Sequence, residues 1–443
     1  MKRTVFLKNI TLLFFGFGLI PRLTFGLSKK NTCKIGIIGA GISGLYLGKY
    51  LTKQGYSVAI LEAKDSAGGR IAENTHFHSH PIDLGAQWIH GKNELYKLVK
   101  KAHTPIYQDK KNDVIKIMYD NQLNDDFPIE FYQFLNEIKR KTPLKNDMSV
   151  LDFAMKFNSD SKFIKLVESA LTDTATRASN FSANEISKLT TKLKTIDYQF
   201  AHTTMYGFVH KNYIEALKDE IVYNFQVSSV DYTKKAIVVA NDAGLAYEFD
   251  KLIITIPITE LKSKKIRFEP DLPKAKWEAF EQIGMDKGLK LFLKFEKQFY
   301  EYSLFNGKYA GYYIDPTKVD SGGHSLLASL IMGNNADTYY DNPNKAIDNY
   351  LNELDGYFNG QASKYFIDAF AQDWGNEKYI NGVYSYTKVG GQTARAVARR
   401  PITNKLYFAG EAMNTNRNYG NVHGAIESAM DVLYHLRFTK SDL

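Results

Sequence analysis

The sequence predicts an α/β fold, and two features of its first sixty residues carry that prediction. Residues 34–38 (KIGII) form a short apolar run typical of a buried strand, and residues 45–51 continue as an amphipathic helix. A second apolar run, residues 57–61 (SVAIL), then completes a strand–helix–strand unit. Such a unit predicts a parallel sheet whose faces are covered by helices.

A glycine turn joins the first strand to the helix, with the spacing Gly39-x-Gly41-x-x-Gly44. Gly39 allows the tight turn, Gly41 lets the backbone approach a pyrophosphate, and Gly44 lets the helix pack closely on the strand. The N–H groups at the helix start would face the phosphates. Glu62 ends the second strand 18 residues past Gly44, where a carboxylate can accept both ribose hydroxyls. We therefore expect a Rossmann-type dinucleotide site here, in preference to an ordinary strand–helix turn.

The composition is that of a globular chain of 443 residues, a length for which two domains are expected. The formal net charge is +9, but residues 1–34 hold seven Lys and Arg and no acid, so the remainder carries only +2. A nearly neutral body gives no reason to expect a nucleic-acid partner. Cys33 is the only cysteine, which excludes an internal disulfide and a thiolate metal cluster.

Residues 1–27 have the layout of a secretory signal rather than of a folded segment. A basic start precedes the apolar run of residues 10–20, and Thr24 and Gly26 offer small residues before a cleavage point. The run is shorter than the ~20 residues that a membrane-spanning helix needs. We expect an exported protein, periplasmic or secreted, or one that an uncleaved segment anchors to a membrane; the alternative is a buried N-terminal helix.

The middle of the chain alternates between helical and strand patterns. Helical patterns dominate residues 92–204, at 94–102, 127–139, 150–158, 161–172 and 183–192. Strand patterns are predicted at 207–210, 227–230, 236–240, 251–257, 289–295, 309–314 and 325–332, and helices at 212–221, 344–357 and 361–372. His76, His78 and His80 lie in a proline-flanked loop, where a solvated turn is expected rather than a metal site, and we predict no metal elsewhere.

Two loops that follow Glu62 carry residues that ordinary turn chemistry does not demand. Gly69 and Arg70, within AKDSAGGRI (63–71), suit a loop along a ligand phosphate, because glycine permits close approach and arginine supplies charge-assisted donors. Residues 82–91 (IDLGAQWIHG) form a second such loop, which runs from polar to aromatic residues.

Together these motifs resemble the FAD-dependent amine oxidase family, and residues 84–91 are most similar to its polyamine oxidase branch. Residues 374–386, the strand that ends in AGE at 409–411, and the helix that opens at 420–429 extend the resemblance towards the C-terminus. It implies an amine oxidase fold with a discontinuous FAD-binding domain (33–90, 205–265 and 385–437). The substrate-binding domain, of α+β type, would be inserted as residues 91–204 and 266–384.

The resemblance also implies a set of cofactor contacts and noncovalent FAD. Some family members attach flavin through a cysteine at the position that Val383 occupies here. The implied FAD-binding residues are Gly39, Gly41, Ile42, Ser43, Gly44, Glu62, Ala63, Gly69, Arg70, Gly85, Ala86, Gln87, Trp88, Val227, Trp374, Gly410, Glu411, Asn421 and Val422.

Lys290 is the implied catalytic residue. Alternation in residues 289–295 (LKLFLKF) places Lys290 on the face opposite the leucines, and in the family a lysine of such a strand holds a water against flavin N5. A solvated strand lysine and the nearby Lys287 are the alternatives. The substrate would meet Trp88, His90, Tyr384 and Asn421. Asn421 departs from the family, which usually has tyrosine there.

The reaction implied is removal of a hydride from the carbon beside an amine nitrogen. Side chains do not accept two electrons, so a flavin is needed; the imine hydrolyses to aldehyde and amine, and O₂ becomes H₂O₂. We expect a polyamine-like substrate. A monoamine or L-amino-acid oxidase of the same fold is the alternative, and a flavin-binding redox or interaction scaffold without oxidase turnover is a third reading. The oligomeric state is not set by the sequence.

Overall fold

The computed structural model describes residues 22–23, 33–108, 114–171, 174–189, 196–316 and 324–438. Most of the predicted signal segment lies outside these residues, so export and anchoring stay predictions. Arg22–Leu23 form strand β1, which pairs with β14 (Ala246–Phe249). No helix in the described part of the chain is long and apolar enough to cross a membrane.

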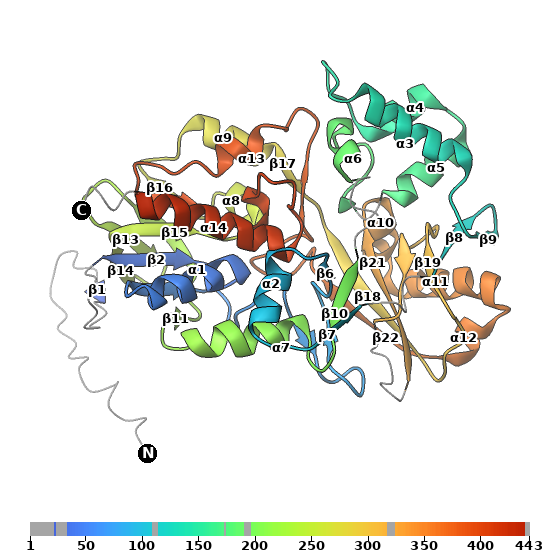
Figure 1. Ribbon diagram of the computed structural model, residues 1–443, viewed down its shortest axis with the longest axis horizontal. Helices are drawn as coiled ribbons and strands as arrows, with labels where there is room; N and C mark the ends of the chain where they lie inside the picture. The colour runs from blue at the N-terminus through green and yellow to red at the C-terminus, as the bar shows by residue number, and fades with distance from the viewer. Residues whose placement is uncertain are drawn as a thin grey trace.

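A five-stranded parallel sheet forms the centre of one half of the molecule. Its order is β11 (Ile221–Val222), β3 (Ser57–Leu61), β2 (Lys34–Ile38), β15 (Lys251–Ile254) and β24 (Leu406–Phe408). Every neighbouring pair is parallel. The strands come from distant parts of the sequence, so the chain returns to this sheet after long excursions (Figure 1).

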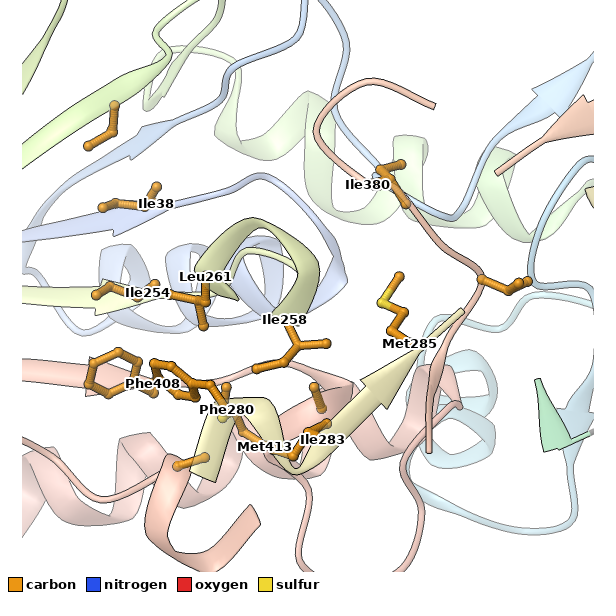
Figure 2. Close-up of a cluster of buried hydrophobic side chains, with 14 of the residues drawn as sticks. Ile38, Ile254, Ile258, Leu261, Phe280, Ile283, Met285, Ile380, Phe408 and Met413 are labelled. Atoms are coloured by element: carbon orange, nitrogen blue, oxygen red, sulfur yellow. The ribbon is translucent and has the colours of Figure 1, made fainter. Parts of the chain in front are cut away.

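Both faces of this sheet are buried, which explains why its strands are almost continuously apolar. One set of alternate residues, including Ile37, Ile60 and Ile253, packs beneath α1 (Ile42–Lys53) and α14 (Val422–Phe438). The other set packs under α8 (Ile258–Lys262) and α9 (Lys274–Glu281), and it includes Ile38, Ile254 and Phe408, which follow one another across the sheet in Figure 2.

A second sheet lies against the first through the same core. Its order is β1, β14, β13 (Ile237–Asn241), β12 (Val227–Asp231) and β16 (Arg267–Glu269). Two short strands, β17 (Ile283–Met285) and β23 (Ser385–Thr387), pair with each other. After β23 the chain continues into α13 (Ala394–Ala398) and, further on, the 3₁₀ turn η4 (Glu411–Met413).

The other half of the molecule is built around the long strand β18 (Gly288–Phe295). It pairs antiparallel with β21 (Ser325–Met332) and β22 (Phe366–Asp373). The further elements are α10 (Asn334–Asp341), α11 (Pro343–Phe358), α12 (Gln361–Tyr365), and a sheet of β20 (Tyr312–Tyr313), β19 (Ser303–Phe305), β8 (Ile115–Tyr119) and β9 (Gln122–Asn124). As predicted, the leucines of β18 lie in one core cluster and Phe292 in another.

The predicted helices of residues 92–204 are confirmed, with ends that differ by up to two residues; the expected end of the last helix, 190–192, lies outside the described residues. They are α2 (Glu94–Lys101), α3 (Ile129–Lys141), α4 (Val150–Phe157), α5 (Ser161–Ala170) and α6 (Ala183–Leu189). The region also contains strands that we did not predict. β8 pairs with β19 on one side and with β9 on the other. β10 (Asp197–Phe200) lies between β6 (Ile89–His90) and β7 (Ile106–Gln108) and pairs with both.

Three predicted elements are wrong in whole or in part. Residues 207–210 are not a strand but lie in α7 (Met205–Val209) and η2 (His210–Ile214), because the Thr204 side chain accepts from Gly207 N and starts a helix there. The expected helix 212–221 is only η2 and a 3₁₀ turn, η3 (Glu215–Leu217), before β11. The expected helix 361–372 stops at Tyr365, because pairing with β18 converts the remainder to β22.

Lys276 on α9 should make the free energy of unfolding of the protein depend on pH. Its ammonium is buried, donates to the carbonyl oxygens of Ala398 and Arg400 at 2.7 Å each, and lies 3.9 Å from the centre of the Phe408 ring. Burial, reinforced by the charge of Arg400, lowers the pKa of Lys276 to about 7, well below its value in an unfolded chain. Below pH 7 the lysine is protonated in both the folded and the unfolded state, and burying its charge lowers the free energy of unfolding by a constant amount. As the pH rises from 7 towards 10.5, the folded state loses this proton first, and the destabilisation becomes smaller.

We expect the free energy of unfolding of the wild type, relative to Lys276→Met, to increase between pH 7 and pH 9.5. Urea unfolding of both proteins at the two pH values measures this difference, and the comparison cancels the titration of tyrosines, which both proteins share. A difference that stays constant or shrinks with rising pH would contradict the assignment.

Candidate functional site

The glycine turn has the geometry of a phosphate-binding loop. Gly39 has a φ of +102°, and a Cβ on Gly44 would lie 2.0 Å from the carbonyl oxygen of Gly39, so the close approach of helix and strand requires glycine. A Cβ on Gly41 would meet no described atom within 4 Å, and no described side chain caps α1, which begins at Ile42. The turn therefore presents open space at the start of a helix. The Ser43 hydroxyl donates to Ala425 O at 2.7 Å and ties α1 to α14.

Glu62 lies at the end of β3 beside this turn, as the spacing predicted. Its carboxylate accepts from Ala40 N at 2.7 Å and from Lys64 N at 2.9 Å, with Ala63 between them in the chain. Burial raises the pKa of Glu62, and the backbone N–H groups counteract part of that rise. A carboxylate has about four acceptor positions, so these backbone donors leave acceptor capacity for a ribose hydroxyl.

The loop of Gly69 and Arg70 crosses directly over the turn. Gly69 has a φ of +61°, and a Cβ on it would lie 3.6 Å from the Cα of Gly41. The Arg70 guanidinium donates through Nη1 to Glu411 Oε1 at 3.0 Å and to Val383 O at 2.8 Å. Arg70 thus links the N-terminal phosphate loop to the two C-terminal segments that the resemblance singled out.

Glu411 is the centre of a buried polar network. Its carboxylate accepts from Arg70, from the Ser385 hydroxyl at 2.6 Å and from Gly420 N at 2.8 Å. Burial opposes its charged form, but Arg70, Arg395 and these donors outweigh that effect and lower the pKa of Glu411. Gly410, which precedes it, has a φ of +129°.

Arg395 belongs to the same network and was not predicted. It donates through Nη1 to Ser385 Oγ at 2.8 Å and to Ala412 O at 2.7 Å, and it lies over the Tyr419 ring. Its Nε and Nη2 atoms are buried without a hydrogen-bond partner among the described residues. Neither a motif nor a periodicity marks this arginine, since its partners come from separate segments of the chain.

The loop of residues 82–91 meets Lys290 on β18. The Lys290 ammonium donates to Asp83 O at 2.7 Å, to Gln87 Oε1 at 2.8 Å and to Gly85 O at 3.3 Å. It also lies 5.9 Å from the centre of the Trp88 ring. Lys290 is only 3% exposed, which corrects the solvated-lysine alternative, whereas Lys287 is exposed and donates to Asn376.

Burial shifts the pKa values of both charged groups at this point. It lowers the pKa of Lys290 and raises that of the Asp83 carboxyl, while their mutual attraction counteracts both shifts. The Asp83 carboxylate accepts from Met205 N at 2.9 Å at the start of α7. Asp83 therefore connects the lysine to a helix that the sequence did not predict.

Tyr384 and Asn421 lie close together, as expected of two walls of one site. A Cβ on Gly420 would be 3.0 Å from Cδ2 of Tyr384, and Asn421 follows Gly420 directly. The Asn421 amide donates to Tyr419 O at 3.2 Å, and Val422 begins α14. Trp374 is buried and donates through Nε1 to Leu84 O at 3.0 Å, so it supports the loop that receives Lys290.

The remaining predicted residues have structural contacts of their own. Val227 starts β12 and is buried in the core. A Cβ on Gly85 would lie 1.9 Å from Arg70 O, so this glycine is required by close packing of two loops, and Ala86 N donates to the same oxygen at 3.4 Å.

His90 has an acidic partner that sequence reasoning missed. Its Nδ1 lies 3.0 Å from Asp197 Oδ1, directly across from it in the pairing of β6 with β10, and both side chains are about two-fifths exposed. Asp197 was overlooked because β10 was not predicted.

The loop of His76, His78 and His80 is only partly the solvated turn that we expected. His76 and His80 are exposed, but His78 is buried, and its Nε2 lies 2.9 Å from His324 O. The described residues contain no group of three or more His, Cys, Asp or Glu side chains placed to hold a metal ion.

These residues fit FAD. The open space at Gly41, the uncapped start of α1 and the buried Glu62 carboxylate match the pyrophosphate and ribose of a dinucleotide. The loop that packs Gly69 against Gly41 also carries Arg70, a cation that is paired with Glu411. The turn and its neighbours therefore offer backbone N–H groups, a carboxylate and a guanidinium, which are the kinds of group that bind a pyrophosphate and a ribose.

Comparisons with known proteins agree with this geometry. The family model for flavin containing amine oxidoreductase matches residues 42–432. Probable polyamine oxidase 4 of Arabidopsis thaliana is 27% identical, over 90% of this chain and 86% of that protein. Polyamine oxidase 4 of Oryza sativa subsp. japonica is 26% identical, over 89% of this chain and 86% of that protein.

Solved structures confirm the predicted α/β fold. Putrescine oxidase bound to putrescine superimposes with a TM-score of 0.80 at 20% identity, covering 94% of this chain and 100% of that chain. Cyclohexylamine oxidase from Brevibacterium oxydans gives a TM-score of 0.78 at 20% identity, covering 91% and 99%. The chain therefore belongs to the flavin containing amine oxidoreductase family and is an oxidoreductase that acts on CH–NH groups.

Proposed function

We propose that this enzyme oxidises a polyamine-like substrate, with FAD held noncovalently and O₂ as the final electron acceptor. The observation that carries the proposal is the junction between Lys290 and the loop of residues 82–91. This loop resembles the polyamine oxidase branch in sequence. It accepts the three hydrogen bonds of the buried lysine, and it also contains His90. The similarity to plant polyamine oxidases supports the same substrate class.

The reaction converts a secondary amine, O₂ and water into an aldehyde, a shorter amine and H₂O₂. A bound FAD supplies the acceptor for the hydride that leaves the carbon beside the nitrogen. Arg70, Glu62 and the turn at Gly41 would hold this cofactor. Trp88 and Tyr384 would exclude water and confine the amine in its neutral form, because only a nitrogen with a free lone pair can assist the departure of hydride.

Noncovalent attachment is supported by the residue before Tyr384 and by the position of the single cysteine. Val383 offers no thiol, and its carbonyl oxygen accepts from Arg70. Cys33 lies just before β2, in the core cluster beneath α1 and α14, and burial raises the pKa of its thiol. A buried thiol of raised pKa is a poor nucleophile for flavin attachment.

A peroxide assay with a panel of amines tests the proposal. We expect the purified yellow protein to release H₂O₂ with spermine or spermidine faster than with tyramine or L-amino acids. Acid precipitation should leave the flavin in the supernatant, since no bond holds it. A yellow protein that releases no peroxide with any amine of the panel would refute the oxidase function and favour the scaffold alternative.

The amino-acid alternative requires an arginine that receives a substrate carboxylate. Arg70 is paired with Glu411. Arg395 donates through Nη1 to Ser385 and Ala412 O, and its Nε and Nη2, which have no hydrogen-bond partner among the described residues, are buried away from solvent. We therefore rank this alternative below the polyamine-like substrate, and the same panel of amines distinguishes the two.

A further inference from the structure

We propose that Arg395 and Tyr419 are positioning residues that set the width of the amine site and so decide which amines it admits. The walls of that site would be Tyr384 and Asn421, so the inference rests on the proposed function and adds to it the residues that determine substrate width. Neither positioning residue has to touch the amine, because each acts through a neighbour in the chain.

Arg395 reaches both segments that carry these walls. Its Nη1 donates to the Ser385 hydroxyl at 2.8 Å, and Ser385 follows Tyr384 directly. Its Cζ lies 3.8 Å from the centre of the Tyr419 ring, two residues before Asn421. One side chain therefore fixes a residue close to each wall.

Gly420, between Tyr419 and Asn421, is the point where the two segments meet. It has a φ of +77°, and a Cβ on it would lie 3.0 Å from Cδ2 of Tyr384. Its N–H donates to Glu411 Oε2 at 2.8 Å, and the Asn421 amide donates to Tyr419 O at 3.2 Å. A displacement of Tyr419 therefore reaches Asn421 through a single residue that packs closely against the opposite wall.

A second element of the chain fixes the Tyr419 hydroxyl. It donates to Glu185 Oε2 at 2.9 Å, and Glu185 is buried on α6. Burial, and then the charge of Glu185, raise the pKa of Tyr419, so the hydroxyl keeps its proton and remains a donor. The tyrosine is therefore held at its ring face by Arg395 and at its hydroxyl by Glu185.

The place of Arg395 is unfavourable for stability alone. Its Nε and Nη2 are buried with no hydrogen-bond partner among the described residues, and unpaired donors of a charged group cost free energy. The attraction between the guanidinium and the Tyr419 ring recovers part of that cost. Replacing a buried charge with a well-packed apolar side chain is often neutral or stabilising. The property that this arginine provides is therefore a fixed geometry of the two segments.

The test uses two amines that the protein can bind but cannot oxidise, tert-butylamine and 1-adamantylamine. The carbon beside their nitrogen carries no hydrogen, and they differ in width. Tyr419→Leu removes the ring that lies on Arg395 and leaves the contacts of Glu411 in place. In calorimetry of the FAD-loaded protein, the ratio of the two Kd values should shift in favour of the wider amine by on the order of tenfold, the lower end of what a misfit of one methylene costs in a pocket.

A ratio of two affinities does not depend on the fraction of folded protein, so a loss of stability alone leaves it unchanged. Tyr419→Phe keeps the ring on Arg395 and should hold the ratio within about threefold of the wild type. Tyr365→Leu is the matched control, because Tyr365 is also half-buried and has Lys297 at 4.3 Å from its ring centre, on α12. An unchanged ratio in Tyr419→Leu, or an equal shift in Tyr365→Leu, would overturn the proposal.

Peroxide release separates this inference from the proposed function. With butylamine and cyclohexylamine, which differ in width and can be oxidised, Tyr419→Leu should shift the ratio of kcat/KM values in the same direction. If Tyr419→Leu changes the ratio of Kd values but the wild type oxidises no amine, the proposed function fails and this inference holds. If the wild type oxidises spermine but Tyr419→Leu leaves both ratios unchanged, only this inference fails.

Discussion

Replacing Lys290 with methionine is expected to lower amine-dependent peroxide release by about 10²- to 10⁴-fold, the range that a positioned proton-transfer group contributes. Methionine keeps the length and apolar stem of lysine but removes every N–H. The variant should still bind FAD, because the turn at Gly41 and the Glu62 carboxylate, which would hold the pyrophosphate and ribose, are separate from the contacts of Lys290. Peroxide release and the visible flavin spectrum of the same sample measure both properties.

The environment of Lys290 explains the size of this effect. An ammonium has three N–H groups, and Asp83 O, Gln87 Oε1 and Gly85 O provide three acceptors. Burial lowers the pKa of Lys290 and so makes release of one proton easier than from an exposed lysine. A neutral amine keeps two donors and gains a lone pair, which can hold a water molecule; the longest contact, to Gly85 O at 3.3 Å, would be the one given up.

Two comparisons separate chemistry from folding. Lys287→Met removes an exposed lysine three residues away and should leave peroxide release within twofold of the wild type. Lys290→Met leaves three acceptor oxygens, of Asp83, Gly85 and Gln87, without their donor, so we expect its free energy of unfolding to fall by about 1–3 kcal/mol. If Lys290→Met is folded, yellow and as active as Lys287→Met, Lys290 has no catalytic role.

The sequence was sufficient for the parts of the site that local geometry determines. Gly44 is required mainly by a contact within the turn itself, since its Cβ would lie 2.0 Å from Gly39 O, and Glu62 follows from the length of one strand–helix–strand unit. The alternation in β18 likewise placed Lys290 on the correct face, because side-chain direction in a strand has a period of two.

The parts that were missed depend on contacts between distant segments. Asp197 meets His90 only after β10 pairs with β6, and Arg395 meets Glu411 only through Ser385. The stretch from Phe366 to Asp373 has a helical pattern, yet it becomes a strand because β18 offers it a partner. Tertiary pairing overrides local preference in such places, and a single sequence carries little record of it.

Gly41→Ala is expected to weaken FAD binding at least about tenfold, by 1.4 kcal/mol or more, while the protein keeps its stability. Gly41 has a φ of −72°, which alanine adopts without strain, and the added methyl would meet no described atom within 4 Å. The free energy of unfolding of the apoprotein should therefore change by no more than about 0.5 kcal/mol. The methyl would occupy the space that the pyrophosphate needs beside the start of α1.

Gly44→Ala should have the opposite pattern, because its methyl would lie 2.0 Å from Gly39 O and 3.0 Å from Thr255 Oγ1. Thr255 donates to Ile38 O and Gly39 O and so fixes the turn in place. We expect a loss of about 3 kcal/mol or more in stability, since the helix has to move away from the strand. Cofactor affinity would then fall as a consequence of unfolding.

Urea unfolding of the apoproteins and titration with FAD separate the two variants. Gly356→Ala is the control, because Gly356 lies in α11 and its added methyl would also meet no described atom within 4 Å. It should keep the FAD affinity of the wild type and gain up to about 1 kcal/mol, because alanine favours a helix. If Gly41→Ala binds FAD as tightly as Gly356→Ala, the pyrophosphate does not approach the backbone at Gly41. The open space at that glycine would then have no role in holding the cofactor.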